Sequence, residues 1–382
     1  MTKSFTRQEL QSLLAPHPAP CISLFLPTHR RSPDAEQDPV RFKNLLGSAE
    51  GLLRKEYTSK DTDVLLAPLQ ALLHDDFWRQ QLDGLAVFHS ADLIAHYRIP
   101  FPLPERAVVA DTFHLKPLVK FMQTNRRFFV LALSQNSVAL YEGTPDSLEM
   151  VNLPALPASL TEELGIEQRE SFLNLHASRA GKAAPMYHGH GMPPTENEKD
   201  ELARFFRAID AALWEGALRE EHAPLVLAGV GYYHPIYRAL SRYQALATQG
   251  VEGNFERTTP EELHAKVWPI VSELFREQES TVLNEYGRLV GNGQAVDDLH
   301  TIAQAAIQSR VHRLLVAEGA HLWGRLNRDS GAIIQHPTQQ DTHDDDVLDD
   351  LAECVLTRRG EVLLLEADRM PSPSPAAAIL RW

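Results

Sequence analysis

Short apolar runs alternate with amphipathic stretches throughout the first third of the chain. CISLFLPTHR predicts a strand that ends at a charged turn, and GLAVFHS and LIAHYRIP predict two more strands on either side of Ala91. Residues 42–53 and 64–77 have the periodicity of helices. We therefore expect an α/β unit, which leads through FHLKPL (residues 113–118) into the next part of the chain.

The middle third opens on paired strands. FFVLALSQNSVALYEG, residues 128–143, predicts two strands joined by a tight turn at Gln135–Asn136, because asparagine tolerates a positive φ. LEMVNLP predicts a third strand. Further along, APLVLAGVGYYHPIYRAL (residues 223–240) predicts a buried strand, a glycine-bearing turn and a helix.

An irregular stretch and a clearly signalled helix lie between these elements. The stretch is about 35 residues long, and segments of that length without secondary structure are usually functional or disordered. It contains the long loop 176–194, HASRAGKAAPMYHGHGMPP. The helix begins at a capping box of Thr195 and Glu198. One apolar stripe marks its buried face: Leu202, Phe205, Phe206, Ile209 and Leu213.

The last third again alternates helices and strands. Residues 271–290 predict a long amphipathic helix, residues 296–309 a second helix and residues 312–319 a strand. Residues 354–366 and the ending AAAILRW predict two further strands. Such alternation is typical of an α/β/α sandwich. We therefore expect three α/β domains: residues 1–123, 124–265 and 266–382.

Charge restricts how this chain can meet nucleic acid. Its 382 residues have a formal net charge of −14. Lys and Arg number 14 against 14 Asp and Glu up to residue 123, then 12 against 19 up to residue 265, then 11 against 18. A surface coated with nucleic-acid-binding charge is excluded, so any RNA contact must be a local patch or a single loop.

Cysteine usage and hydropathy point to the cytoplasm. Cys21 and Cys354 are the only cysteines and form no CxxC motif, which excludes a disulfide scaffold and a cysteine zinc ribbon. Apolar runs are too short to cross a bilayer, and MTKSFTRQEL lacks the apolar segment of a secretory signal. We expect a cytoplasmic protein that binds neither membrane nor DNA.

The common enzyme signatures are missing. The chain has no GxxxxGK[ST], GxSxG, HExxH or GxGxxG motif. Gly229–Val230–Gly231 follows a strand but lacks the third glycine of a dinucleotide site, so a tight strand-to-helix turn is the favoured interpretation. We expect no cofactor.

The sharpest local feature is His188-Gly189-His190-Gly191. Its glycines let the backbone approach a ligand closely, and imidazoles exchange protons near neutral pH. Three interpretations stay open: a tip that inserts into a crowded polar site, an exposed loop with incidental histidines, and a zinc site with His176. Two histidines at i and i+2 without a nearby carboxylate are weak zinc ligands, so we expect no metal. Arg179 and Lys182 suit contact with a phosphate backbone.

Two further groupings have ordinary explanations. DTHDDDVLDD (residues 341–350) could hold a divalent cation, but it lacks the glycine and closing glutamate of a calcium loop, and a solvated loop is favoured. An aromatic group could stack on bases, although its position at a helix start favours packing between domains. This group is Tyr232, Tyr233, His234 and Tyr237.

In the order of these signals, residues 124–382 resemble the archaeo-eukaryotic peptide-chain release factor and Pelota superfamily, specifically its bacterial branch. The hairpin FFVLALSQNSVALYEG is similar to the strands that open that family's central domain, and LVLAGVGYYHPIY to the strand and turn that close it. AAAILRW resembles the last strand of the Pelota-like C-terminal domain. HGHG lies where the family has a Gly-Gly-Gln loop, again followed by a long helix.

Departures from the family shape the expected function. Gly-Gly-Gln, which helps water attack the peptidyl-tRNA ester in the family, is absent, and GNGQ (residues 291–294) lies far from the loop position. The codon-reading Asn-Ile-Lys-Ser is also missing, since Leu45 and Leu46 follow Asn44. The resemblance therefore implies a translation factor that binds the ribosomal A site without reading stop codons.

The implied role is ribosome hibernation or rescue of stalled ribosomes, with the ribosome and a translational GTPase as partners. The residues expected to contact RNA are Arg179, Lys182, His188, Gly189, His190 and Gly191. One alternative is a peptidyl-tRNA hydrolase in which His188 or His190 acts as the general base. Another is a non-ribosomal interaction protein that retains the fold.

Overall fold

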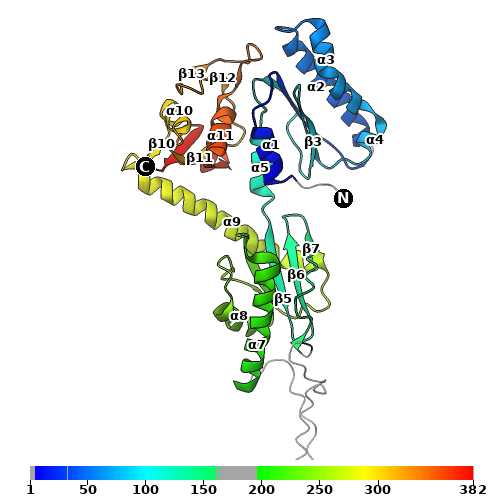
Figure 1. The fold of residues 1–382 in the computed structure, drawn as a ribbon, viewed down its shortest axis with the longest axis vertical. Helices are drawn as coiled ribbons and strands as arrows, with labels where there is room; N and C mark the ends of the chain where they lie inside the picture. The colour runs from blue at the N-terminus through cyan, green and yellow to red at the C-terminus, as the bar shows by residue number, and fades with distance from the viewer. Residues whose placement is uncertain (1–4, 32, 161, 163–195, 382) are drawn as a thin grey trace, which may run out of the picture. The chain divides into compact units, whose positions relative to one another are not determined.

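The computed structural model describes residues 5–31, 33–160, 162 and 196–381 (Figure 1). The chain divides into two compact units. The first unit combines Met1–Thr124 with Thr281–Trp382, and the second is Asn125–Ser280. The predicted α/β fold class is confirmed, since sheets and helices alternate in both units. The division into three domains stays a prediction.

The first part of unit 1 is an antiparallel sheet with helices on both faces. Its strand order is β3–β2–β1–β4. Phe42 and Leu45 of α2 pack on one face, and Leu13 of α1 and Phe121 of α5 pack on the other. The elements are α1 (Arg7–Leu14), β1 (Cys21–Pro27), α2 (Asp38–Leu53), α3 (Ser59–Gln70), α4 (Asp75–Trp78), β2 (Gly84–His89), β3 (Ile94–Ile99), β4 (Arg106–Ala110) and α5 (Lys116–Thr124).

The second part of unit 1 is an α/β/α sandwich. Its sheet has the order β10–β16–β11–β15, and a smaller sheet has the order β13–β12–β14. Helices α10 and α11 cover one face of the larger sheet, while Tyr286 near the end of α9 packs on the other. The elements are α9 (Pro260–Val290), β10 (Ala295–Val296), α10 (Leu299–Ile307), β11 (Val311–Ala317), β12 (Trp323–Leu326), β13 (Ile333–Gln335), β14 (Asp345–Asp346), α11 (Val347–Thr357), β15 (Glu361–Leu365) and β16 (Ala376–Leu380).

Unit 2 is built on one mixed sheet with the order β7–β6–β5–β8–β9. Strands β5, β8 and β9 are parallel, and the β5–β6 hairpin pairs Leu133 with Val138. The predicted stripe of α7 is buried on one face, and Val267 of α9 packs on the other. The elements are β5 (Phe128–Leu133), β6 (Val138–Gly143), β7 (Leu148–Met150), α7 (Glu196–Leu213), β8 (Leu225–Gly229), α8 (Tyr233–Leu240) and β9 (Val251–Glu252).

Helix α9 begins at Pro260, well before the predicted start at residue 271. Its first turn is closed by a capping box, in which the N–H of Glu262 donates to Thr259 Oγ1 and the N–H of Thr259 donates to Glu262 Oε2, each at 3.3 Å. Proline at the first helical position lacks an N–H that would otherwise need a partner. The helix continues through Pro269, which lies two residues before the predicted start.

The strand predicted for residues 354–366 is wrong in its first half. Residues up to Thr357 belong to α11, and only β15 is a strand. Helix α11 is buried from Val347 to Val355, and its polar side chains, Asp349, Asp350 and Glu353, are buried with the rest. Arg359, with φ 60°, lies in the turn between the two elements.

Candidate functional site

The predicted site residues lie outside the described residues. These are Arg179, Lys182, His188, Gly189, His190 and Gly191, together with His176 and with Thr195 of the predicted capping box. What the structure does describe is how the chain on either side of residues 163–195 is held.

The chain before this segment is attached to the β5–β6 turn. The N–H of Leu160 donates to the carbonyl of Gln135 at 2.8 Å, and the N–H of Val138 donates to the carbonyl of Ala158 at 3.1 Å. These bonds lie where the parallel strands β5 and β8 end. In open α/β sheets this carboxyl edge is the usual place for ligand-binding groups.

Polar side chains fix the turn itself. Ser134 Oγ accepts the N–H groups of Asn136 at 3.1 Å and Ser137 at 2.9 Å, and donates to Glu256 Oε1 at 2.7 Å. Asn136 Nδ2 donates to the same oxygen at 3.1 Å. The turn at Gln135–Asn136 was predicted, but Glu256 is 122 residues from Ser134, and no local pattern reveals such a partner.

After the segment, α7 is anchored by aromatic packing. Phe206 is 1% exposed and makes edge-to-face contacts with Tyr233 and Tyr237, with ring centroids 5.5 Å and 5.7 Å apart. The two tyrosines belong to the core of unit 2. Neither base stacking nor packing between domains, the two predicted roles, describes these rings. Burial raises the pKa of both phenols, which therefore stay protonated.

The acidic run 341–350 is not the solvated loop that we predicted. Asp344 and Asp346 are fully buried, and Asp349 is 1% exposed. The carboxylate of Asp349 accepts the N–H groups of Leu115 at 2.9 Å and Lys116 at 2.6 Å. These partners lie more than 200 positions away, so the sequence does not show that the carboxylates are paired.

Cations complete this buried polar seam, by which we mean residues 114–116 together with His321, Arg328 and residues 345–353. Lys116 Nζ forms an ion pair with Asp346, and His321 Nδ1 lies 2.8 Å from Asp346 Oδ2. Arg328 Nη2 donates to Asp350 Oδ1 and Glu353 Oε2, each at 2.7 Å. The seam joins the two parts of unit 1 and has a structural role.

The carboxyl groups of this seam differ in pKa, because burial raises the pKa of each and only some have cations that outweigh it. Burial raises the pKa of Asp349 to about 7 and that of Asp350 to about 6. Burial also acts to raise the pKa of Asp346, but the hydrogen bond from His321 and the charge of Lys116 outweigh it, and the pKa falls well below its ordinary value. In the part of the chain that the structure describes, no three His, Cys, Asp or Glu side chains are arranged to hold a metal ion.

GNGQ has a structural role in the turn that ends α9. Gly293 has φ +69°, a left-handed conformation that favours glycine, and the N–H of Gln294 donates to the carbonyl of Leu289 at 3.2 Å. The carbonyl of Gln294 accepts the N–H of Leu380 at 2.7 Å, which ties the turn to β16. Its position between α9 and α10 is as predicted.

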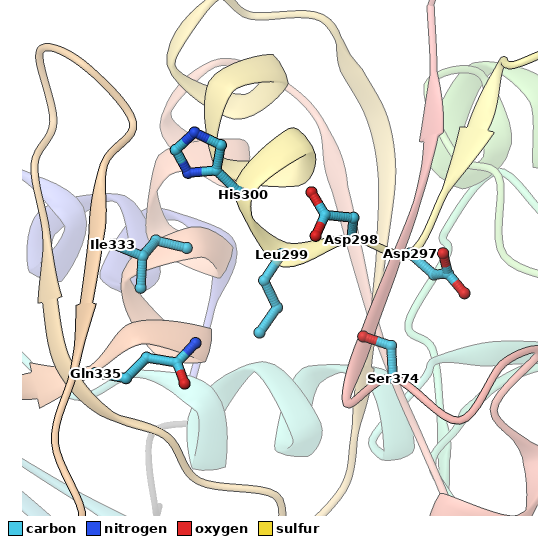
Figure 2. Close-up of a pocket in the computed structure, with 7 residues that line it drawn as sticks. All are labelled: Asp297, Asp298, Leu299, His300, Ile333, Gln335 and Ser374. Atoms are coloured by element: carbon cyan, nitrogen blue, oxygen red, sulfur yellow. The ribbon is translucent and has the colours of Figure 1, made fainter.

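Unit 1 also has a hollow of about 350 Å³ beside the start of α10. Figure 2 shows Leu299 and His300 on this helix, Ile333 and Gln335 on the facing strand β13, and Ser374 below Asp297. Asp298 caps α10 by accepting the N–H of Thr301 at 2.8 Å. Hydrogen bonds from the Thr301 side chain and backbone lower the pKa of Asp298. The two carboxylates make this hollow unsuitable for a phosphate.

None of the described helices combines the length and apolar character needed to cross a membrane. Residues 127–310, just under half of the chain, match the family described as bacterial archaeo-eukaryotic release factor family 3. The match over these residues confirms the predicted resemblance to the release-factor superfamily.

Solved structures of this superfamily resemble the chain at low identity. Archaeal Pelota, from a model of ribosome-bound archaeal Pelota and ABCE1, is 14% identical with a TM-score of 0.42, covering 100% of this chain and 95% of that one. Dom34 of S. cerevisiae, described as interacting with Hbs1, is 11% identical with a TM-score of 0.39, covering 78% and 73%.

The archaeal translation termination factor aRF1 is 14% identical with a TM-score of 0.26, covering 98% of this chain and 97% of that one. None of these three likenesses carries a functional conclusion. No curated protein matches the chain.

Proposed function

We propose that this protein is a ribosome-associated translation factor that occupies the A site during hibernation or rescue of stalled ribosomes, and that it does not read stop codons. The observation that carries the proposal is the family match over residues 127–310, which includes HGHG and both of its flanks. The attachment of Leu160 to the β5–β6 turn and the burial of the α7 stripe support it, because they fix both ends of the segment to one sheet.

In this proposal, His188-Gly189-His190-Gly191 points toward the peptidyl-transferase centre, and Arg179 and Lys182 contact RNA phosphates. Occupancy is favoured over hydrolysis, because the chain lacks the Gly-Gly-Gln motif. The C-terminal part of unit 1 meets a translational GTPase, and the protein acts in the cytoplasm.

Co-sedimentation of the purified full chain with ribosomes tests the proposal. Deleting residues 186–192 should leave the thermal unfolding of both units unchanged and reduce the ribosome-bound fraction at least tenfold. Replacing the same residues by a glycine-serine stretch of equal length controls for segment length and should reduce binding to a similar extent. An unchanged bound fraction in the deletion would remove the segment from the mechanism.

Hydrolysis is tested separately on ribosomes loaded with peptidyl-tRNA. A hydrolase would release peptide, and His188→Ala or His190→Ala would abolish that release. His222→Ala is the matched control, because it removes an exposed imidazole of unit 2 outside the segment. We expect no release above background from the parent protein or from any of these variants.

A further inference from the structure

A second hollow, of about 380 Å³, lies in unit 2 beside the first turn of α8. Gly231, His234 and Arg238 line it from the β8–α8 side, while Gly250 and Glu252 line it from the chain that enters β9. The hollow lies at the carboxyl edge of the parallel strands β8 and β9, the edge at which open α/β sheets place ligands.

Two nitrogen atoms beside this hollow have no partner among the described residues. His234 is 5% exposed, and its Nε2 is buried without a hydrogen bond. Arg238 Nε donates to the carbonyl of Ala247 at 3.2 Å, but its Nη2 is buried and unpaired. Buried polar groups in folded proteins almost always have a hydrogen-bond partner, so two unpaired nitrogens in one place call for an acceptor.

Two glycines keep the hollow open. A Cβ atom at Gly250 would lie 2.8 Å from Cε1 and 2.9 Å from Nδ1 of His234. A Cβ atom at Gly231 would lie 2.9 Å from the carboxylate carbon and oxygens of Glu252. The backbone therefore comes close to both the imidazole and the carboxylate, and a side chain at either glycine would displace the group that it faces.

The chemistry of the lining restricts the ligand. Arg238 can only donate, and so can the imidazolium form of His234, which suits an oxyanion. Glu252 can only accept when ionised, and it would repel a lone anion. A ligand that combines an oxyanion with a neighbouring hydroxyl donor, as the phosphate and ribose of a ribonucleotide do, satisfies all three side chains.

We propose that this hollow binds a ribonucleotide, with its phosphate on Arg238 and His234 and its ribose 2′-hydroxyl donating to Glu252. The ligand is either a free nucleotide or one nucleotide of an RNA strand. The inference goes beyond the proposed function, because the contacts are complete within unit 2 and need no ribosome. A 2′-hydroxyl contact lets a protein distinguish RNA from DNA.

Binding should also change the state of His234. Burial and the charge of Arg238 lower its pKa in the free protein, while Glu252 and the Gly229 carbonyl act in the opposite direction. A bound phosphate adds negative charge beside the ring and favours the imidazolium, so affinity should rise as pH falls from 8 to 6.

Calorimetric titration of the full chain tests the proposal. The probes are adenosine 5′-monophosphate, its 2′-deoxy analogue, adenosine, and six-residue oligoadenylates in the RNA and DNA forms. We expect at least tenfold tighter binding of each ribo form than of its deoxy counterpart, and no binding of adenosine. Equal affinity for the mononucleotide and the RNA identifies a free nucleotide as the ligand, whereas binding of the RNA alone identifies a strand.

Variants locate the site. Arg238→Gln should weaken phosphate binding at least tenfold, and Glu252→Gln should abolish the preference for the ribo form. Arg219→Gln is the control, because it removes an exposed arginine of the same unit and should change neither. Equal losses in Arg238→Gln and Arg219→Gln, or no binding of any probe to the parent protein, overturn the proposal. Normal ribosome co-sedimentation alongside a failed titration removes this inference alone.

Discussion

The carboxylate of Asp349 accepts the backbone N–H of Lys116 at 2.6 Å, although 233 positions separate the two residues. Lys116 Nζ in turn forms an ion pair with Asp346, so its backbone and side chain are both bound by α11 and the strand before it. The two parts of unit 1 therefore meet through buried charges whose removal leaves a partner without compensation.

Lys116→Met should destabilise unit 1 by about 3–5 kcal/mol, because it leaves Asp346 buried beside His321 without its ammonium partner. Lys120→Met is the matched control: the side chain of Lys120 pairs with Glu318, which is 42% exposed, and such pairs contribute at most about 1 kcal/mol. Urea unfolding followed by circular dichroism measures both changes. Similar losses in the free energy of unfolding for the two variants would contradict the structural role given to the buried polar seam.

The pH dependence of stability should change in Asp349→Asn. Because burial raises the pKa of Asp349 to about 7, the folded state keeps a proton that the unfolded state loses near pH 4. Its contribution to the free energy of unfolding is complete below about pH 4 and is lost as pH rises to about 7, on the order of 4 kcal/mol. The Asn variant should lose this slope.

His114 acts in the opposite direction over part of the same window, since burial lowers its pKa and its stabilisation falls as pH decreases. The informative quantity is therefore the difference between the parent and the Asn variant, measured by urea unfolding at pH 4.5, 5.5, 6.5 and 7.5. Parallel curves for the two proteins would show that Asp349 does not titrate in this window.

Phe206→Ala should cost unit 2 about 3–5 kcal/mol, because the ring is buried between Tyr233 and Tyr237 and its loss leaves a cavity. Met150→Ala removes a side chain that is 69% exposed and should cost less than about 0.5 kcal/mol. Thermal unfolding of both variants measures the difference, and a small loss for Phe206→Ala would mean that α7 does not depend on this contact.

Ser134→Ala should loosen the β5–β6 turn. The hydroxyl accepts two N–H groups and donates to Glu256, so its removal should cost about 1–2 kcal/mol and speed hydrogen exchange at Asn136 and Ser137. Ser137→Ala, in the same turn, keeps the hydroxyl of Ser134 and should leave exchange at Asn136 unchanged. Equal protection of the Asn136 amide from hydrogen exchange in the two variants would contradict this role of the Ser134 hydroxyl.

Local patterns predicted most of the elements, because each strand or amphipathic helix carries its own periodicity. The β5–β6 hairpin, the α7 stripe and the β8–α8 turn were all found in this way. Family resemblance came from the order of these signals. Helix α11 was missed because its first carboxylates, Asp349 and Asp350, end an acidic run whose composition favoured a solvated loop.

The long-range polar contacts were not predictable from one sequence. A run such as DTHDDDVLDD has the same composition whether it faces water or meets Lys116 and Arg328, and the distinction depends on residues far along the chain. The unpaired nitrogens of His234 and Arg238 are likewise visible only once the fold places them beside the same hollow. His188 and His190 remain predictions from the sequence.

Residues 125–280 lie between the two segments of unit 1, so the whole of unit 2 is translated before the second segment of unit 1. As the polypeptide emerges, the inserted unit has all its residues available before the final hundred or so have been made, and domains generally fold as units. His114 and Lys116 stay exposed to water until their carboxylate partners, Asp349 and Asp346, have been translated. Closure of unit 1 should therefore be a late event in maturation, after α11 has been translated.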